Sequence, residues 1–410
     1  MRVTRGPVAR RAQPPDVADT VREILRDVCA TGDRAVLRYT AELDREELAP
    51  EQLEVGAEEL DASVGVLEPE VLGGLRMAIA NVDAVVEAQL PEPVSVELPQ
   101  GHTVRVSEVA VGRAGVYAPA GRGAFPSTVV MCAVTAKAAG VDEIAVCTPP
   151  GPGGRAHPVI LAACVLCGVT EVYRMGGAQA IGALAYGTES VRKVDVIVGP
   201  GNAYVQEAKR QVVGEVGIDG IAGPSELVVI ASEGADPELV ALDLLAQAEH
   251  GADSPVAVIS ADRALLERIV AEVEAMAPSR PSVADAELCV ALVDDPLAAL
   301  RMAEKAAPEH LQLAGSEAEA LADRVRTAGC LFVGNGAATA FGDYVAGSNH
   351  VLPTGGAARY QSALSAATFR RRMARVSLPD GAAARLAPAG AALARAEGFP
   401  VHAESMERRA

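Results

Sequence analysis

The spacing of apolar residues divides the chain into a helical beginning and two later series in which strands alternate with helices. In about the first ninety residues, Asp16–Ala30 and Glu68–Gln89 carry apolar side chains at three- and four-residue spacing. This period predicts amphipathic helices with one apolar face. We expect these helices to cover a sheet.

From Arg113 onward, short apolar runs alternate with helical stretches, which indicates βαβ units and a parallel sheet. The first series consists of Ala114–Tyr117, Ser127–Ala139, Glu143–Cys147, Pro158–Cys167, Glu171–Arg174, Gly177–Tyr186, Val194–Val198 and a helix after Gly201. The second series consists of Leu227–Ala231, a helix after Asp236, Val256–Ser260, Arg263–Met276, Leu288–Val293, Pro296–Ala306 and Leu331–Val333. In the first helix of the second series, Asp236 can cap the start, Pro237 fits the first turn and Gly251 ends it.

The two series predict an α/β fold with two Rossmann-like parallel-sheet domains and small N- and C-terminal segments. We expect an N-terminal arm at 1–15, a discontinuous first α/β domain at 16–112 and 227–360, and a second α/β domain at 113–226. The remaining residues, 361–410, form a tail that is too short to bury a core of its own. The tail is therefore expected to dock on something else.

Composition and charge narrow the classes of function. The 410 residues are 50% hydrophobic and 22% charged, as in an ordinary globular protein. A formal net charge of −18 repels polyphosphates and anionic membrane surfaces, so we expect no nucleic acid and no membrane as a partner. No apolar run reaches membrane-spanning length and no signal-peptide pattern opens the chain, which predicts a cytoplasmic location.

The cysteines fit a reducing compartment, because seven of them are scattered along a long chain instead of forming a disulfide pattern. Cys164 and Cys167 form the only CxxC. Their apolar, helical setting in Val159–Cys167 indicates core thiols rather than zinc ligands.

None of the GxG sequences completes the GxGxxG turn of a conventional Rossmann domain. The candidates are Gly121 and Gly123, Gly151 and Gly153, Gly199 and Gly201, and Gly334 and Gly336. The loop Gly199–Asn202, between a strand and a helix, can still bring backbone amides to a ligand, although such a loop is more often only a tight turn.

Four of the six histidines stand near acids or amides in the sequence: His250, His310, His350 and His402. Gln247 and His250 are three residues apart near the end of the well-capped helix, so both are expected to project from one face. Asp343 follows a glycine-rich loop and is a plausible oxygen ligand. One such pair alone is more often a solvated helix face, but imidazoles and a carboxylate without a thiol are typical of a catalytic zinc site.

The pentapeptide Ala307–Leu311 places Glu309 and His310 side by side between a helix and a short strand. A neighbouring acid and base suit proton transfer. In isolation, this pentapeptide is more simply explained as a solvated loop.

Taken together, these segments resemble histidinol dehydrogenase from about Asp16 to His402. The resembling stretches are GVYAPAGRGAFPST (115–128), RMGGAQAIGALAYGTESV (174–191), VDVIVGPGNAYV (194–205), AGPSE (222–226), LLAQAEHG (244–251), APEHL (307–311) and GDYVAGSNHVLPTGGAAR (342–359). The end of the chain, Glu397–His402, matches mainly in the spacing from acid to histidine.

The resemblance implies a zinc site with ligands Gln247, His250, Asp343 and His402. It implies a catalytic pair, Glu309 and His310. Further substrate-holding groups would be Ser225, His350 and Glu397, beside the zinc ligands and His310. NAD would be contacted through Tyr117, Gln179 and Asn202.

The implied reaction takes L-histidinol through L-histidinal to L-histidine with two NAD, the last steps of histidine biosynthesis, in a homodimer whose tails are exchanged between subunits. His310, with an ordinary histidine pKa of about 6.5, suits the role of base for the alcohol proton. Glu309 is placed to activate the water that hydrates the aldehyde, so no cysteine nucleophile is needed.

Two alternatives remain open. A related zinc- and NAD-dependent enzyme on the same scaffold could oxidise another small polyol, because the fold survives a change of substrate. The second alternative is a non-enzymatic α/β protein that binds a metal or an amino acid. This alternative gives Glu309 and His310 no role. Glu397 and His402 favour histidinol over other alcohols.

Overall fold

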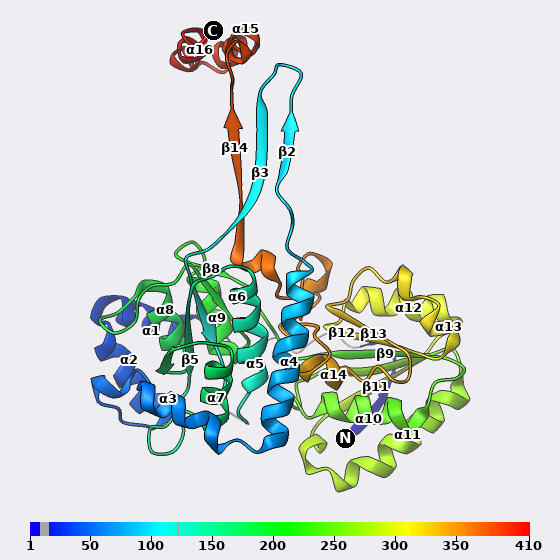
Figure 1. The fold of residues 1–410 in the computed structure, drawn as a ribbon. Helices are drawn as coiled ribbons and strands as arrows, with labels where there is room; N and C mark the ends of the chain where they lie inside the picture. Colours follow the sequence, from blue (N-terminus) through cyan, green and yellow to red (C-terminus); the bar gives the residue numbers. More distant parts are fainter. Residues whose placement is uncertain (9–15, 121–122) are drawn as a thin grey trace. The chain divides into compact units, whose positions relative to one another are not determined.

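The computed structural model describes residues 1–8, 16–120 and 123–410 (Figure 1). The chain divides into two compact units. Unit 1 comprises Met1–Ala88 and Gly112–Phe369, and unit 2 comprises Gln89–Val111 and Arg370–Ala410. In the part of the chain that the structure describes, no helix combines the length and the apolar character needed to span a bilayer.

The second predicted series forms a parallel sheet in unit 1, sheet A, with the strand order β1-β11-β10-β9-β12-β13. Its strands are β1 (Arg2–Arg5), β9 (Leu227–Ala231), β10 (Val256–Ser260), β11 (Glu287–Leu292), β12 (His310–Ala314) and β13 (Cys330–Val333). The expected N-terminal arm therefore begins as an edge strand, because β1 pairs in parallel with β11. Residues 9–15 of that arm lie outside the described residues.

Alternation along the strands of sheet A divides its core into two layers. Leu227 and Val229 pack with helices on one face, whereas Val228 and Ile230 pack with helices on the other. The first layer contains α10 (Pro237–Ala248) and α11 (Arg263–Met276), and the second contains α12 (Pro296–Ala306) and α13 (Ser316–Glu319). Because both faces are covered, the central strands β9 and β10 are almost wholly apolar.

The first predicted series forms a second parallel sheet, sheet B, with the order β6-β5-β4-β7-β8. Its strands are β4 (Arg113–Tyr117), β5 (Glu143–Thr148), β6 (Glu171–Arg174), β7 (Val196–Val198) and β8 (Gly217–Ile218). The helices between them are α5 (Pro126–Val129), the π-helical turn η4 (Val130–Val134), α6 (Thr135–Ala138), α7 (Pro158–Leu166), α8 (Gly177–Tyr186) and α9 (Ala203–Gln211). Cys164 and Cys167 are buried in α7 and just after it, as expected of core thiols. Sheets A and B confirm the predicted α/β fold with two parallel sheets.

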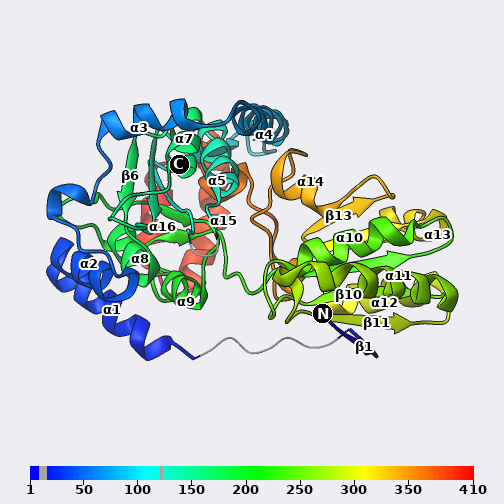
Figure 2. The ribbon, with the colours of Figure 1, turned by 90° about the horizontal axis from the view of Figure 1, so that it is seen from below.

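The N-terminal helices pack on sheet B, not on sheet A. Figure 2 shows α1 (Ala18–Thr31) and α2 (Asp33–Tyr39) beside α8 and α9. The apolar stripe of α1 belongs to the same hydrophobic cluster as Tyr117 and Ile181. A Cβ at Gly182 of α8 would lie only 3.2 Å from Leu25 of α1, so the missing side chain permits this close approach.

The prediction groups residues 16–112 with 227–360, whereas the apolar residues of α1 and α2 share a hydrophobic cluster with sheet B. The period of a helix shows that one face is apolar, but not which surface that face fits. A division of the chain into separately folding domains remains a prediction.

The remaining elements of unit 1 connect these layers. They are η1 (Thr40–Asp44), a π-helical turn, η2 (Pro50–Gln52), α3 (Ala57–Ser63), η3 (Val64–Val66), α4 (Pro69–Glu87), η5 (Ala277–Ser279), η6 (Pro281–Val283), η7 (Ala322–Arg324), α14 (Thr339–Tyr344), η8 (Ala357–Arg359) and η9 (Ala366–Phe369). The Asn81 amide of α4 donates a 2.7 Å hydrogen bond to the carbonyl of Val345, just beyond α14.

Unit 2 is an antiparallel sheet with a pair of helices, and the sequence analysis did not predict its strands. Strand order is β14-β3-β2. The elements are β2 (Val94–Glu97), β3 (Thr103–Ala110), β14 (Arg370–Ser377), α15 (Ala382–Ala396) and α16 (Pro400–Glu407). One buried apolar cluster of unit 2 consists of Ala391, Ala394 and Ala403, with Met406 packed against it. The expectation that residues 361–410 bury no core of their own remains a prediction.

Candidate active site

The Glu309–His310 pair lies where β12 begins, at the amino edge of sheet A. Helix α12 ends at Ala306, and Ala307 adopts a left-handed conformation with φ 50° before Pro308 turns the chain into the strand. Glu309 is 6% exposed and His310 2% exposed. The pair is therefore buried, which excludes the alternative of a solvated loop.

Glu309 is held by donors from the segment that precedes β9. The Ser225 hydroxyl and the Glu226 backbone N–H, the latter at 2.9 Å, both donate to Glu309 Oε2. Gln247 Nε2 donates in turn to Ser225 Oγ at 2.8 Å. Burial raises the pKa of Glu309 above its usual value, although His310 and these donors oppose the shift. The carboxyl group is thus fixed in place and can exchange a proton.

His310 stands between two carboxylates. Its Nδ1 lies 3.4 Å from Glu309 Oε2 and 3.1 Å from the carbonyl oxygen of Glu226, and its Nε2 lies 3.6 Å from Asp343 Oδ1. Burial disfavours the imidazolium, but the charges of Glu309 and Asp343 outweigh it and raise the pKa of His310 to about 9. The pKa of His310 is therefore higher than the ordinary histidine value assumed from the sequence.

Asp343 is surrounded by imidazoles. Burial opposes its charged form, but the hydrogen bond with His310 and the charges of His310, His350 and His250 keep the pKa of Asp343 below its usual value. His350 Nδ1 lies 2.8 Å from the Asp343 carbonyl oxygen, and its Nε2 lies 3.4 Å from Thr128 Oγ1. Asp343 itself lies in the short helix α14 and not in a loop.

His250 lies just beyond the observed end of its helix. Helix α10 begins after the Asp236 cap, as expected, but ends at Ala248, so Gln247 is helical and His250 is not. The Nδ1 of His250 lies 3.2 Å from the Gln247 carbonyl oxygen. The prediction that both side chains project from one helix face is therefore wrong, because the last turn unwinds before Gly251.

The donor types around Asp343 suit a zinc ion. Among residues 1–8, 16–120 and 123–410, no three histidine, cysteine, aspartate or glutamate side chains are grouped so as to hold a metal. Unit 1 does supply an imidazole, a carboxylate and an amide oxygen from His250, Asp343 and Gln247, which are donors that zinc accepts. The fourth predicted ligand, His402, belongs to unit 2. The donors of unit 1 thus fit zinc in their chemistry, and the full ligand set remains a prediction.

The predicted cofactor residues gather at the carboxyl edge of sheet B. Tyr117 ends β4, Gln179 follows β6 in α8, and Asn202 follows β7 and caps α9. Carboxyl ends of parallel strands are where α/β sheets bind ligands. The Tyr117 hydroxyl accepts a 3.1 Å hydrogen bond from Gly177 N–H, and Asn202 Oδ1 is engaged by the N–H of Tyr204 and Val205. The amide nitrogen of Asn202 is thus the group that cap bonding does not use.

Glu397 and His402 are exposed residues of unit 2. Glu397 follows the last residue of α15, and the His402 ring in α16 stacks on Phe399 with 5.1 Å between ring centroids. The structure therefore brings together Ser225, Gln247, Glu309, His310, Asp343 and His350 in unit 1, whereas Glu397 and His402 belong to unit 2. The roles of all these residues remain predictions.

Asp44 is a polar residue beside the cofactor candidates that the sequence analysis missed. Gln179 Nε2 donates to Asp44 Oδ2 at 3.3 Å, and burial raises the pKa of Asp44 to about 6. Asp44 lies 135 positions before Gln179, so no local motif could have joined the two. Thr128, beside His350, was missed for the same reason.

A cavity of about 460 Å³ lies elsewhere, beside β1. Its lining includes Arg5, Arg263 and Met302 and none of the candidate residues. Cavity size therefore does not mark the candidate site, whose side chains are close packed and hydrogen bonded.

Comparison with known proteins gives one consistent result. Residues 8–410 match the family model described as histidinol dehydrogenase. The chain is 44% identical to histidinol dehydrogenase of Rhodospirillum rubrum over 407 residues, covering 98% of this chain and 94% of the relative. It is 44% identical to histidinol dehydrogenase 2 of Trichormus variabilis over 396 residues, covering 95% and 92%. The crystal structure of histidinol dehydrogenase from Elizabethkingia anophelis superposes with a TM-score of 0.94 at 32% identity, covering 100% of this chain and 98% of that chain.

Proposed function

Because the chain belongs to the histidinol dehydrogenase family, and is thereby an oxidoreductase as the sequence predicted, we propose that it oxidises L-histidinol through L-histidinal to L-histidine with two NAD. The observation that carries this proposal is the buried Glu309–His310 pair beside Asp343. A protein that only binds a small molecule has no need for an acid and a base buried in direct contact.

In the first oxidation, a hydride leaves the alcohol carbon for NAD while His310 accepts the hydroxyl proton. The raised pKa of His310 means that the imidazole must first lose its own proton. Asp343 contributes to this raised pKa. If Asp343 held zinc, the ion would offset the negative charge that stabilises the imidazolium.

In the second oxidation, water adds to the aldehyde and a second hydride leaves the hydrate. Glu309 is suited to accept the proton from that water, since burial raises the pKa of its carboxyl group and two donors fix its orientation. Both steps release hydride to NAD, so four electrons leave each substrate.

We assign the zinc ligands to Gln247, His250, Asp343 and His402, with Ser225, His350 and Glu397 as further substrate contacts. When bound, zinc would orient the imidazole and amine of the substrate and polarise its alcohol. NAD would lie at the carboxyl edge of sheet B against Tyr117, Gln179 and Asn202. This arrangement uses strand ends and a helix start in place of the missing glycine fingerprint.

We propose a homodimer in which unit 2 of one chain completes the site of its partner, in the cytoplasm where the biosynthetic reaction belongs. Unit 2 exposes large apolar side chains that a second subunit could cover: Val94, Val96, Met373, Val376, Leu378, Leu393, Phe399 and Val401. It also carries the two candidate residues that unit 1 does not, Glu397 and His402.

The function is tested by following NADH formation with L-histidinol against a panel of other small alcohols, together with the zinc content of the protein. We expect two NADH per histidinol and zinc in the active protein. Faster turnover of another polyol would identify the related dehydrogenase, and no NADH with any alcohol would contradict the enzymatic proposal.

Subunit mixing tests the exchanged tails. His402→Ala and His310→Ala homodimers should each be inactive, but a hybrid holds one site with an intact core from the first chain and an intact tail from the second. Activity should therefore return when subunits exchange. Verified exchange without recovered NADH formation would show that unit 2 serves its own chain.

A further inference from the structure

A buried ion pair lies behind the loop that follows β7. Lys209, in α9, contacts Asp219, just after β8, and their side chains are only 1% and 6% exposed. A lysine ammonium is rarely buried, because it is strongly hydrated in water. Nearby Lys193 and Glu215 form a similar pair, 3.2 Å apart, with side chains 47% and 60% exposed. The burial is thus a property of this pair and not of the region.

Both members of the buried pair bind the same residue, Gly199. Lys209 Nζ donates to the Gly199 carbonyl oxygen at 3.0 Å, and the Gly199 N–H donates to Asp219 Oδ2 at 2.7 Å. Gly199 has a φ of 114°, and a Cβ there would collide with the carbonyl oxygen of Tyr117. The ion pair therefore fixes a peptide that only glycine can form, against the end of β4.

Gly199 begins the loop that leads to Asn202, and the far end of the loop is also braced. Gln206 Nε2 donates to the Gly201 carbonyl oxygen at 3.4 Å, and Gln206 Oε1 accepts from Ala222 N–H at 2.8 Å. Residues 199–202 are thus joined to 219–222 at both ends. Tyr117 and Asn202, two of the proposed cofactor contacts, flank this braced segment.

Lys209 acts through Gly199 and not on a ligand. The cavity next to it, lined by Gly199, Lys209, Asp219 and Gln361 among others, has a volume of about 20 Å³. That volume holds about one water molecule and no organic ligand. A buried ion pair is also weak evidence for stability, because burying both charges costs about as much as their attraction returns. The geometry of the loop is what the pair visibly determines.

We propose that Lys209 and Asp219 are positioning residues that hold Gly199–Asn202 in the conformation that binds the dinucleotide. This inference rests on the proposed function for the identity of the ligand. It assigns the pair an effect on cofactor binding and none on the binding of the alcohol. If the loop populates its binding conformation only about one tenth of the time without the pair, cofactor affinity falls about tenfold.

The test uses the double variant Lys209→Met/Asp219→Asn in the full-length dimer. Methionine keeps the length of the side chain, and asparagine still offers an oxygen to Gly199 N–H, so no unpaired charge remains buried. Lys209→Gln/Asp219→Asn is the second variant, for use if the first does not fold; it also leaves no buried charge, and glutamine keeps a donor for the Gly199 carbonyl. The matched control is Lys193→Met, which removes a lysine from the exposed pair. Hydrogen exchange of peptides covering 199–205, without ligand, and NADH affinity by fluorescence are measured in each protein.

We expect faster exchange at 199–205, unchanged exchange at 227–231, and about tenfold weaker NADH binding with unchanged histidinol affinity. The Lys193→Met control should match the wild type. Unchanged exchange at 199–205, equal acceleration throughout the protein, or faster loop exchange with unchanged NADH affinity would each overturn the proposal. If the wild type binds no NADH, the proposed function fails, whereas the exchange result still decides whether the pair positions the loop.

Discussion

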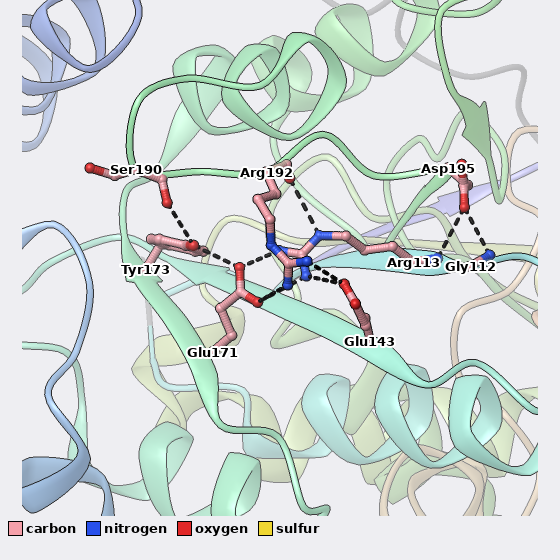
Figure 3. Close-up of polar contacts among 8 residues, drawn as sticks. All are labelled: Gly112, Arg113, Glu143, Glu171, Tyr173, Ser190, Arg192 and Asp195. Atoms are coloured by element: carbon pink, nitrogen blue, oxygen red, sulfur yellow. Dashed lines mark hydrogen bonds and ion pairs between the residues drawn. The ribbon is translucent and has the colours of Figure 1, made fainter.

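The amino edges of the two parallel sheets hold polar clusters of opposite design. At the edge of sheet B, Arg113 begins β4, Glu143 begins β5 and Glu171 begins β6 (Figure 3). Arg113 Nη1 donates to Glu171 at 2.9 Å and to Glu143 at 3.1 Å, and Arg192 also contacts both acids. At the edge of sheet A, His310 begins β12 with Glu309 directly before it. The described partners of Glu309 are the Ser225 hydroxyl, the Glu226 backbone N–H and the His310 imidazole.

The two clusters differ in whether their basic group can release a proton. A guanidinium keeps its charge at any ordinary pH, so it fixes the acids of sheet B as carboxylates. Burial opposes the charged form of Glu171, but the Arg113 contact wins and lowers the pKa of Glu171. An imidazole can give up its proton, so the Glu309–His310 pair can change charge during a reaction. The amino edge of a parallel sheet is therefore suited to stability in sheet B and, in the proposed function, to proton transfer in sheet A.

His310→Gln should produce the largest effect and act on the chemistry alone. Glutamine keeps a polar contact with the Glu226 carbonyl but cannot serve as a base near neutral pH. We expect NADH formation from histidinol to fall by roughly 10³–10⁴-fold, with a melting temperature close to that of the wild type. Residual activity above one tenth of the wild type would remove His310 from the reaction.

Arg113→Met should have the reverse effect. Its removal leaves the half-buried Glu171 with only Arg192, 3.5 Å away, as a cationic partner. We expect a loss of roughly 3 kcal/mol in the free energy of unfolding, at the low end for a broken buried pair because Arg192 remains. Denaturant unfolding measures the loss, and turnover per folded molecule should be unchanged.

Arg192→Ala is the matched control for Arg113→Met. Arg192 contacts the same two acids but is 65% exposed, so water can replace its contacts. The loss of unfolding free energy should stay below about 1 kcal/mol. Equal destabilisation by both variants would contradict the view that burial gives Arg113 its importance.

Glu309→Gln should separate the two half-reactions. Only the oxidation of histidinal requires an activated water, so that step should slow by roughly 10²-fold while the histidinol step changes less. Glutamine can still accept from Ser225 and Glu226, which keeps the site folded. Single-turnover assays with each substrate measure the split, and equal damage to both steps would contradict the assignment.

The smallest expected effect is on how the free energy of unfolding changes at acid pH. The pKa of Glu171 is lowered in the folded protein, so its contribution to stability is present above its unfolded pKa and is lost as the pH falls through the folded value. Glu171→Gln should therefore flatten the decline of unfolding free energy below about pH 4.5. Unfolding curves from pH 6 to pH 3 would detect this, and identical slopes in both proteins would contradict it.

Much of the fold and the site was determined by the sequence alone. Alternating apolar runs predicted both parallel sheets, and Asp236 and Pro237 marked the start of α10, because periodicity and capping are local properties. The sequence motifs also identified the family and most candidate residues. Local patterns could not predict the joining of distant parts, such as β3 to β14 or Gln179 to Asp44.

Tertiary structure alone decided how these parts act together. It placed the apolar stripe of α1 against α8, set His310 between two carboxylates that raise its pKa, and closed Lys209 and Asp219 around Gly199. Each outcome depends on which surfaces fit and which charges lose their water when the chain folds. Such effects depend on distance and burial in three dimensions, and the spacing of residues along the chain gives no information on either.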